Sequence, residues 1–175
     1  MGSLHRGRQS IAFDEHPAIL ASSAIAGKKE QEGPLSSYFD YVSSDTTFKQ
    51  DSWEKAETKL QMLALDAASR KAGIHDKEID ALFAGDLLNQ CISSTFAIRD
   101  RGIPFLGLYG ACSTMAEGLT MAGMMVNSTY ARVAAAVSSS FIASPPLHVL
   151  SYASQPTAMT KKDRPAETPP QGDVY

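Results

Sequence analysis

A cysteine set among small residues is the side chain of this sequence best placed to do chemistry. Cys112 lies in the run Gly-Ala-Cys-Ser-Thr at 110–114, between an apolar segment typical of a strand and one typical of a helix. A turn of this kind can place the thiol at a helix N-terminus, where unpaired N–H groups and the helix dipole favour a thiolate. Two interpretations stay open: a nucleophile, or a small buried residue, because free cysteines are among the most buried side chains.

Further polar residues lie where ligands often bind in α/β proteins. Asp86 directly follows an apolar segment, 79–84, and Asn89 comes three residues later. Strand ends of open α/β sheets border ligand crevices, so both are candidate ligand-binding residues, with Cys112 as a pocket wall. A turn or capping role is the alternative for Asp86 and the favoured one for Asn89. Ser113 and Thr114 offer backbone N–H groups that can bind a carboxylate or simply start the helix.

Catalysis by Cys112 would need partners that the sequence does not offer nearby. A cysteine nucleophile requires an activating base and donors for an oxyanion. His148 is the one histidine after Cys112, and it lies in a proline-rich segment. The two cysteines, Cys91 and Cys112, lack the spacing of metal ligands, so we expect neither a metal nor a cofactor. The residues alone therefore favour a small buried cysteine over a nucleophile at Cys112.

Hydrophobic periodicity predicts alternating helices and strands after residue 51. Asp51 and Glu54 have the spacing of a capping box at the start of the first helix, and Gly73 suits its C-terminal end. The order of elements favours an α/β fold with a mostly parallel sheet and helices on both faces. The expected helices span 52–72, 93–101 and 114–127, and the expected strands span 79–84, 104–109 and 132–138.

The helix that follows Cys112 is apolar or small around nearly its whole circumference. Glu117, Thr120 and Asn127 are its polar interruptions. Such a helix is normally buried on all sides, and one sheet can cover only one of them. A second layer of protein must cover the outer side, and a homodimer is one way to supply it.

Composition separates a folded part from a tail. The chain has 175 residues, a net charge of −3 and 43% hydrophobic residues, which suits one soluble domain and gives no case for nucleic-acid binding. No apolar run approaches the length of a transmembrane helix. Six of the nine prolines lie between Pro145 and Pro170. We expect the fold to occupy 1–140 and a proline-rich, disordered tail to occupy 141–175.

Several stretches together resemble one family, stage V sporulation protein AD, whose members are thiolase-like proteins of spore-forming bacteria. The most specific are Ala-Gly-Asp-Leu-Leu-Asn-Gln at 84–90 and Gly-Ala-Cys-Ser-Thr at 110–114. The resemblance runs from about residue 10 to residue 140. The stretches that carry it are 13–17, 29–35, 53–57, 84–90, 103–106 and 110–114.

The resemblance implies a thiolase-like fold of which this chain is the N-terminal half, with the helix at 114–127 in a central layer. It implies binding of dipicolinic acid, as its calcium chelate, and a role in moving it into the forespore and out at germination. The expected partners are membrane-embedded SpoVA proteins, which would hold a soluble protein at the inner spore membrane.

The resemblance also marks what this chain lacks. Cys112 matches the nucleophile of thiolase-like enzymes, whose other catalytic residues lie in a second half. The resemblance therefore implies a chain that is not an enzyme, in which Cys112 is vestigial or lines a ligand pocket. Because family members are longer by that half, we hypothesise a truncated gene or a frameshift near residue 140. The alternatives are an acyl-transferring condensing enzyme that uses Cys112, and an inactive fragment.

Overall fold

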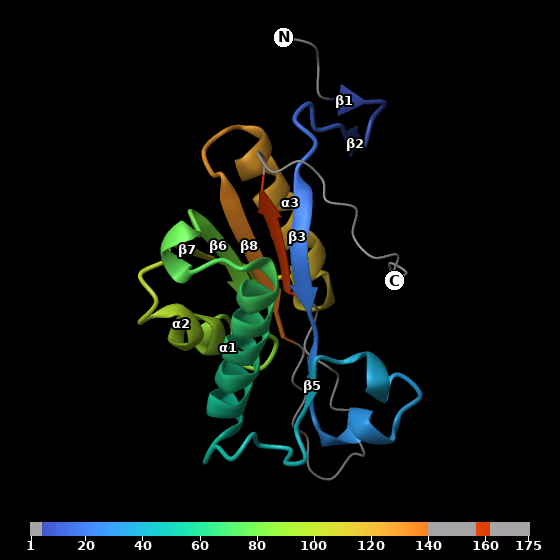
Figure 1. Ribbon diagram of the computed structural model, residues 1–175, viewed down its shortest axis with the longest axis vertical. Helices are drawn as coiled ribbons and strands as arrows, with labels where there is room; N and C mark the ends of the chain where they lie inside the picture. The colour runs from blue at the N-terminus through green and yellow to red at the C-terminus, as the bar shows by residue number, and fades with distance from the viewer. Residues whose placement is uncertain (1–4, 140–156, 162–175) are drawn as a thin grey trace.

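A computed structural model describes residues 5–139 and 157–161. Its centre is a five-stranded sheet in the order β3-β9-β8-β6-β7, flanked by three α-helices (Figure 1). The sheet strands are β3 (Ala18–Ser23), β6 (Ala81–Gly85), β7 (Phe105–Gly107), β8 (Val133–Ser138) and β9 (Thr157–Lys161). The α-helices are α1 (Trp53–Ala72), α2 (Ile92–Ile98) and α3 (Thr114–Asn127). The short elements are β1 (His5–Arg6), β2 (Ser10–Ile11), β4 (Ile25–Ala26), β5 (Tyr41–Val42), η1 (Lys28–Glu32), η2 (Ser36–Tyr38), η3 (Asp76–Glu78) and η4 (Ala111–Ser113).

The middle of the sheet is parallel, as the alternation of helices and strands predicts. β6 pairs in parallel with β7 on one side and with β8 on the other. β9 is antiparallel to both of its neighbours, β8 and β3, so the sheet is mixed. The expected α/β fold with a mostly parallel sheet is confirmed.

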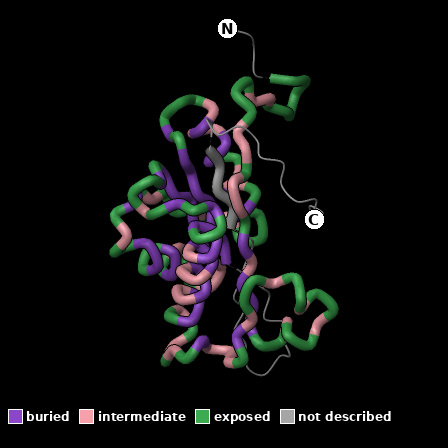
Figure 2. Tube along the Cα trace, in the orientation of Figure 1, coloured by how far each residue is buried: buried purple, intermediate pink, exposed green. Residues whose placement is uncertain are grey.

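Alternating side chains of β6 form two cores, one on each face of the sheet. Leu82 and Ala84 pack with α1 and α2, whereas Ala81 and Phe83 pack with α3. Every residue of β6 and β8 is buried, and Figure 2 shows these two strands and the inner side of α1 as the buried centre. Such continuous burial is typical of parallel strands covered on both faces.

The first helix begins at a different cap from the expected one. Ser52 is the N-cap, and its side chain accepts a hydrogen bond from the backbone N of Lys55 at 3.3 Å. Asp51, the expected cap, instead forms an exposed ion pair with Lys55. Ser52 can act as the N-cap because its backbone has the extended conformation that an N-cap residue requires. Gly73 ends the helix in the left-handed conformation, as expected.

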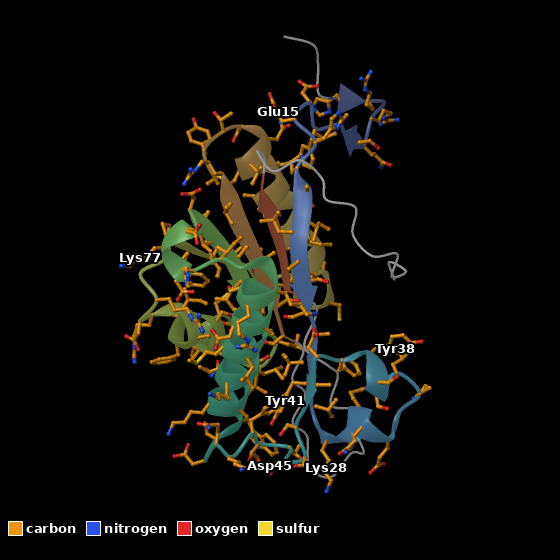
Figure 3. The ribbon with its side chains drawn as sticks, in the orientation of Figure 1. Glu15, Lys28, Tyr38, Tyr41, Asp45 and Lys77 are labelled. Carbon is orange, nitrogen blue, oxygen red and sulfur yellow. The ribbon has the colours of Figure 1, made fainter. Side chains whose placement is uncertain are left out.

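One part of the chain projects beyond the sheet. Residues 25–51 contain η1, η2 and the two-stranded parallel pairing of β4 with β5 (Figure 1). Tyr38 is 80% exposed there, and Figure 3 shows it on the outside of this projection, as it does Lys28. The projection is mostly exposed in Figure 2, and Phe48 near its end is buried in a core cluster with Ile25 and α1.

The last α-helix, α3, is covered on one side. Ala122 and Val126 are buried against the sheet, while Phe13 lies over Gly123 near its far end. Ala116, Thr120 and Met121 are exposed on the outer side. The sequence predicts that α3 is apolar or small on nearly every side. In the structure the outer side is uncovered, so small and apolar side chains face outward there.

The region expected to be a disordered tail contains one ordered strand. Residues Thr157–Lys161 form β9, which lies between β3 and β8. For these five residues the expectation of disorder is wrong, because two neighbouring strands offer backbone groups that a strand here can pair with. The rest of 141–175, His148 included, lies outside the described residues.

Candidate functional site

The turn at 110–114 lies directly before α3, as the sequence predicts. Cys112 sits in the single turn η4 with an exposed side chain. Ala111 has φ of 48°, a left-handed conformation that alanine rarely adopts. Strained backbone of this kind is common at functional sites and is held by its surroundings.

Hydrogen bonds join the 110–114 segment to the start of α3. The hydroxyl of Ser113 donates to Oε1 of Glu117 at 2.6 Å, and the backbone N of Gly110 donates to Thr114 Oγ1 at 3.2 Å. A Cβ added to Gly110 would overlap the Glu117 carboxyl group. Gly110 therefore admits the carboxylate, which is favourable near a helix N-terminus. Cys112 and Ser113 remain exposed, while Thr114 is buried.

Asp86 is not directed at open space. Its carboxyl group is 1% exposed and accepts hydrogen bonds from the backbone N of Cys91 at 3.1 Å and from Ser94 N and Oγ, both at 2.7 Å. These contacts match the capping alternative. Asn89 is exposed in the same β6–α2 loop, which spans residues 86–91. Ligand binding by Asp86, Asn89, Cys112, Ser113 and Thr114 stays a prediction.

Sequence reasoning missed a buried polar cluster beside Asp86. Glu57 and Gln61 on α1 are both fully buried. Ser139, after β8, donates to Glu57 Oε1 at 2.7 Å and accepts from Gln61 Nε2 at 2.7 Å. The sequence did contain one indication of this cluster. Glu57 and Gln61 are four residues apart and fall on the same face of the predicted helix as its apolar residues, which is the face expected to be buried.

The two cysteines differ in accessibility, which predicts a difference in reactivity. The Cys91 thiol donates to the carbonyl oxygen of Leu108 at 3.1 Å, and burial, followed by the Asp86 charge, raises its pKa above the usual range. Cys112 is exposed. We expect iodoacetamide at neutral pH to label Cys112 at least about tenfold faster than Cys91, because alkylation requires an accessible thiolate.

Peptide mass spectrometry of a labelling time course measures both rates, and Cys112→Ser is the control for assignment. Labelling of Cys91 should accelerate as the pH rises, because its thiol must first lose a proton that burial retains. Faster labelling of Cys91 at neutral pH would contradict the placement of the two side chains.

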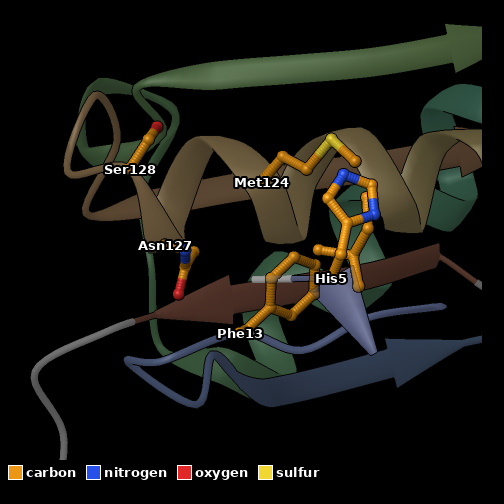
Figure 4. Close-up of a pocket in the computed structure, with 6 residues that line it drawn as sticks. His5, Phe13, Met124, Asn127 and Ser128 are labelled. Carbon is orange, nitrogen blue, oxygen red and sulfur yellow. The ribbon is translucent and has the colours of Figure 1, made fainter. Parts of the chain in front are cut away.

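An apolar pocket beside α3 lies at the opposite end of the helix from Cys112. Phe13, Met124 and Asn127 contribute to a cavity of about 420 Å³ (Figure 4). Met124 is ten residues into α3, about 15 Å from its start. The pocket is thus separate from the turn that carries Cys112.

With this geometry described, comparison with known proteins gives a family. The family profile described as stage V sporulation protein AD (SpoVAD) matches residues 7–149. The chain belongs to the stage V sporulation protein AD family. A curated member, stage V sporulation protein AD of Bacillus subtilis (strain 168), is 41% identical over 135 residues. That alignment covers 77% of this chain and 40% of the relative, so the chain spans well under half of it.

Solved structures show the fold that this stage V sporulation protein AD member shares. The 3-oxoacyl-[acyl-carrier-protein] synthase III of Aquifex aeolicus VF5 aligns with a TM-score of 0.58 at 12% identity, covering 85% of this chain and 55% of that one. Xanthomonas campestris OleA (H285N) aligns with a TM-score of 0.58 at 10% identity, covering 83% and 56%. The expected thiolase-like fold is confirmed, and these likenesses show the fold alone.

The family match reaches residue 149, beyond the expected end of the resemblance near 140. In the part of the chain that the structure describes, no helix has the length and apolar character needed to cross a bilayer.

Proposed function

We propose that this chain contributes to dipicolinic acid binding in the stage V sporulation protein AD system, and through it to dipicolinate movement during spore formation and germination. The observation that carries the proposal is the family match over residues 7–149. It includes the β6–α2 loop and the Cys112 turn, so both candidate segments are present in this chain.

The geometry of the turn is compatible with an anionic ligand. Cys112 and Ser113 are exposed at the start of α3, a helix of 14 residues. The N-terminal end of such a helix favours negative charge, and dipicolinate carries two carboxylates. Membrane-embedded SpoVA proteins are the partners we propose, and calcium is the accompanying ion.

Calorimetric titration of this chain with dipicolinate, with and without calcium, tests the proposal beside a full-length relative. Benzene-1,3-dicarboxylate is the matched control ligand, because it keeps both carboxylates and lacks the ring nitrogen. We expect saturable heat with dipicolinate and little with the control. Binding by the full-length relative but not by this chain would overturn the proposal for this chain.

An acyl-transferring condensing activity is the second candidate, favoured by the exposed Cys112 on a thiolase-like fold. It predicts covalent labelling of Cys112 by an acyl-CoA, with a mass increase of one acyl group and release of free CoA. A Cys112→Ser variant should lose this labelling. Saturable dipicolinate binding without acylation favours the first candidate.

An inactive fragment is the third candidate, and the outer side of α3 is the reason. Met121 is 38% exposed there, beside exposed Ala116 and Thr120. Exposed apolar surface of this kind favours association, and a homodimer through α3 would cover it. Light scattering distinguishes the cases: a stable monomer argues against association through α3.

A further inference from the structure

Two acidic side chains are enclosed together at the carboxyl end of β6. Glu57 on α1 is fully buried, and Asp86 at the start of the β6–α2 loop is 1% exposed. Among the residues that the structure describes, their hydrogen-bond partners are serine hydroxyls and backbone N–H groups, with no basic side chain. Two buried negative charges without a cation are costly, so something must neutralise one of them.

A continuous chain of hydrogen bonds joins the two carboxyl groups. Gln61 Nε2 lies at its centre and donates to Ser94 Oγ at 3.1 Å and to Ser139 Oγ at 2.7 Å. Ser94 Oγ in turn donates to Asp86 Oδ2, and Ser139 Oγ to Glu57 Oε1, each at 2.7 Å. Both serine protons therefore point from the central amide towards a carboxyl group.

The two carboxyl groups are not equally supported. The Asp86 oxygens accept three hydrogen bonds, which satisfies a carboxylate. Glu57 Oε1 accepts one short hydrogen bond, from Ser139, and one long one, from Leu87 N at 3.3 Å. Among the described residues, Glu57 Oε2 has no hydrogen-bond partner, and neither has Oε1 of Gln61, one helical turn further along α1. A proton on Oε2 would remove the buried charge and turn that atom from an unsatisfied acceptor into a donor.

We propose that the cluster binds one proton, on Glu57, and that by neutralising this buried charge the proton stabilises the packing of the β6–α2 loop and the end of β8 against α1. Glu57 contacts the loop at Leu87 N and the end of β8 at Ser139. The same loop reaches the Cys112 turn, because the thiol of Cys91 donates to the carbonyl oxygen of Leu108. Loss of the proton leaves a second negative charge buried beside Asp86, and the cost of that charge lowers the stability of the packed state.

The surroundings of Glu57 set the direction of the pH dependence. Burial raises the pKa of Glu57 above its usual range, and the Asp86 charge raises it further, against the opposing hydrogen bonds from Ser139 and Leu87. Of the described elements that surround the carboxyl group, the β6–α2 loop presents the charged Asp86, while α2 and the end of β8 present the hydroxyls of Ser93 and Ser139.

A raised carboxyl pKa means that the folded chain binds more protons than the unfolded chain. Stability is then greatest below the ordinary glutamate pKa, and it falls as the pH rises through the raised value. A Glu57→Gln variant keeps the shape of the protonated acid and cannot ionise, so it should lack this fall. Glu32→Gln is the matched control, because Glu32 is exposed on η1.

Thermal unfolding of the whole chain, followed between about pH 5 and about pH 8, tests the stability effect. We expect the melting temperature of the parent and of E32Q to fall by about 3–5 °C relative to E57Q over this range. Parallel pH profiles for the parent and E57Q would overturn the proposal.

Infrared spectroscopy tests the proton directly and remains decisive if E57Q fails to fold. The parent should keep the C=O stretch of a protonated carboxylic acid at a pH above the ordinary glutamate range, and the band should disappear as the pH is raised further; folded E57Q should lack it throughout. Absence of the band from the parent at every pH above the ordinary glutamate range would overturn the proposal. Neither measurement needs a ligand, so each stands apart from the dipicolinate titration.

Discussion

Replacing Gly85 with alanine is expected to lower the free energy of unfolding by about 3 kcal/mol or more, because overpacking in a closed core forces neighbouring groups to move. Gly85 ends β6 and is buried. An added Cβ would overlap the carbonyl oxygen of Leu108 and lie 2.6 Å from Cγ2 of Thr114. Leu108 is tied in place by its backbone N, which donates to Ala84 O at 2.8 Å. Relief of the clash would displace the backbone that leads into the Cys112 turn.

Denaturant unfolding monitored by circular dichroism measures the effect. Gly33→Ala is the matched control: φ there is −85°, and an added Cβ would lie 3.4 Å from the nearest atom, an ordinary contact. We expect this control to stay within about 0.5 kcal/mol of the parent. Equal midpoints for the two variants would contradict the close packing of β6 against Leu108.

Replacing Asp86 with alanine is expected to lower the free energy of unfolding by about 2–4 kcal/mol, because it leaves buried hydrogen-bond donors without an acceptor. The groups affected are the backbone N–H groups of Cys91 and Ser94 and the hydroxyl of Ser94. Relief of the repulsion on Glu57 offsets part of the loss. Asp86→Asn keeps one acceptor oxygen and should lower the free energy of unfolding by less. It still loses some stability, because its NH₂ group donates and lies where a hydrogen-bond donor needs an acceptor.

Unfolding and dipicolinate titration of the same variants separate a structural role of Asp86 from a ligand-binding one. Asn89→Ala is the control within the loop, since Asn89 is exposed. We expect D86A to lose stability and N89A to keep it. The opposite result would contradict a capping role. In that case D86A would be as stable as the parent and would no longer bind dipicolinate.

Elements set by strong local signals could be predicted closely. The expected helix at 114–127 is α3 to the residue, and the expected helix at 52–72 begins one residue later, at Trp53. Both combine a sustained helical period with recognisable ends. The expected helix at 93–101 is shorter in the structure, Ile92–Ile98, because short helices carry fewer local signals and depend on packing.

Features that depend on contacts between distant segments could not be predicted. β9 lies in a segment whose composition favours disorder, and it is a strand because β3 and β8 pair with it. The polar cluster around Glu57 joins α1, the β6–α2 loop and the end of β8, which no local window contains. The Cys112 turn could be found, because small residues between a strand and a helix are a local pattern.

The order of the strands has a consequence for how this chain reaches its folded state. β3 is made before the other strands of this sheet, yet, among the described strands, the one to which it hydrogen-bonds is β9, whose residues are made more than a hundred positions later. During synthesis β3 is therefore without this partner until after β6, β7 and β8 have been made. Closing such a long loop slows folding and prolongs the exposure of unpaired strand edges. We expect completion of the sheet, rather than formation of its parallel centre, to limit the rate at which the protein folds.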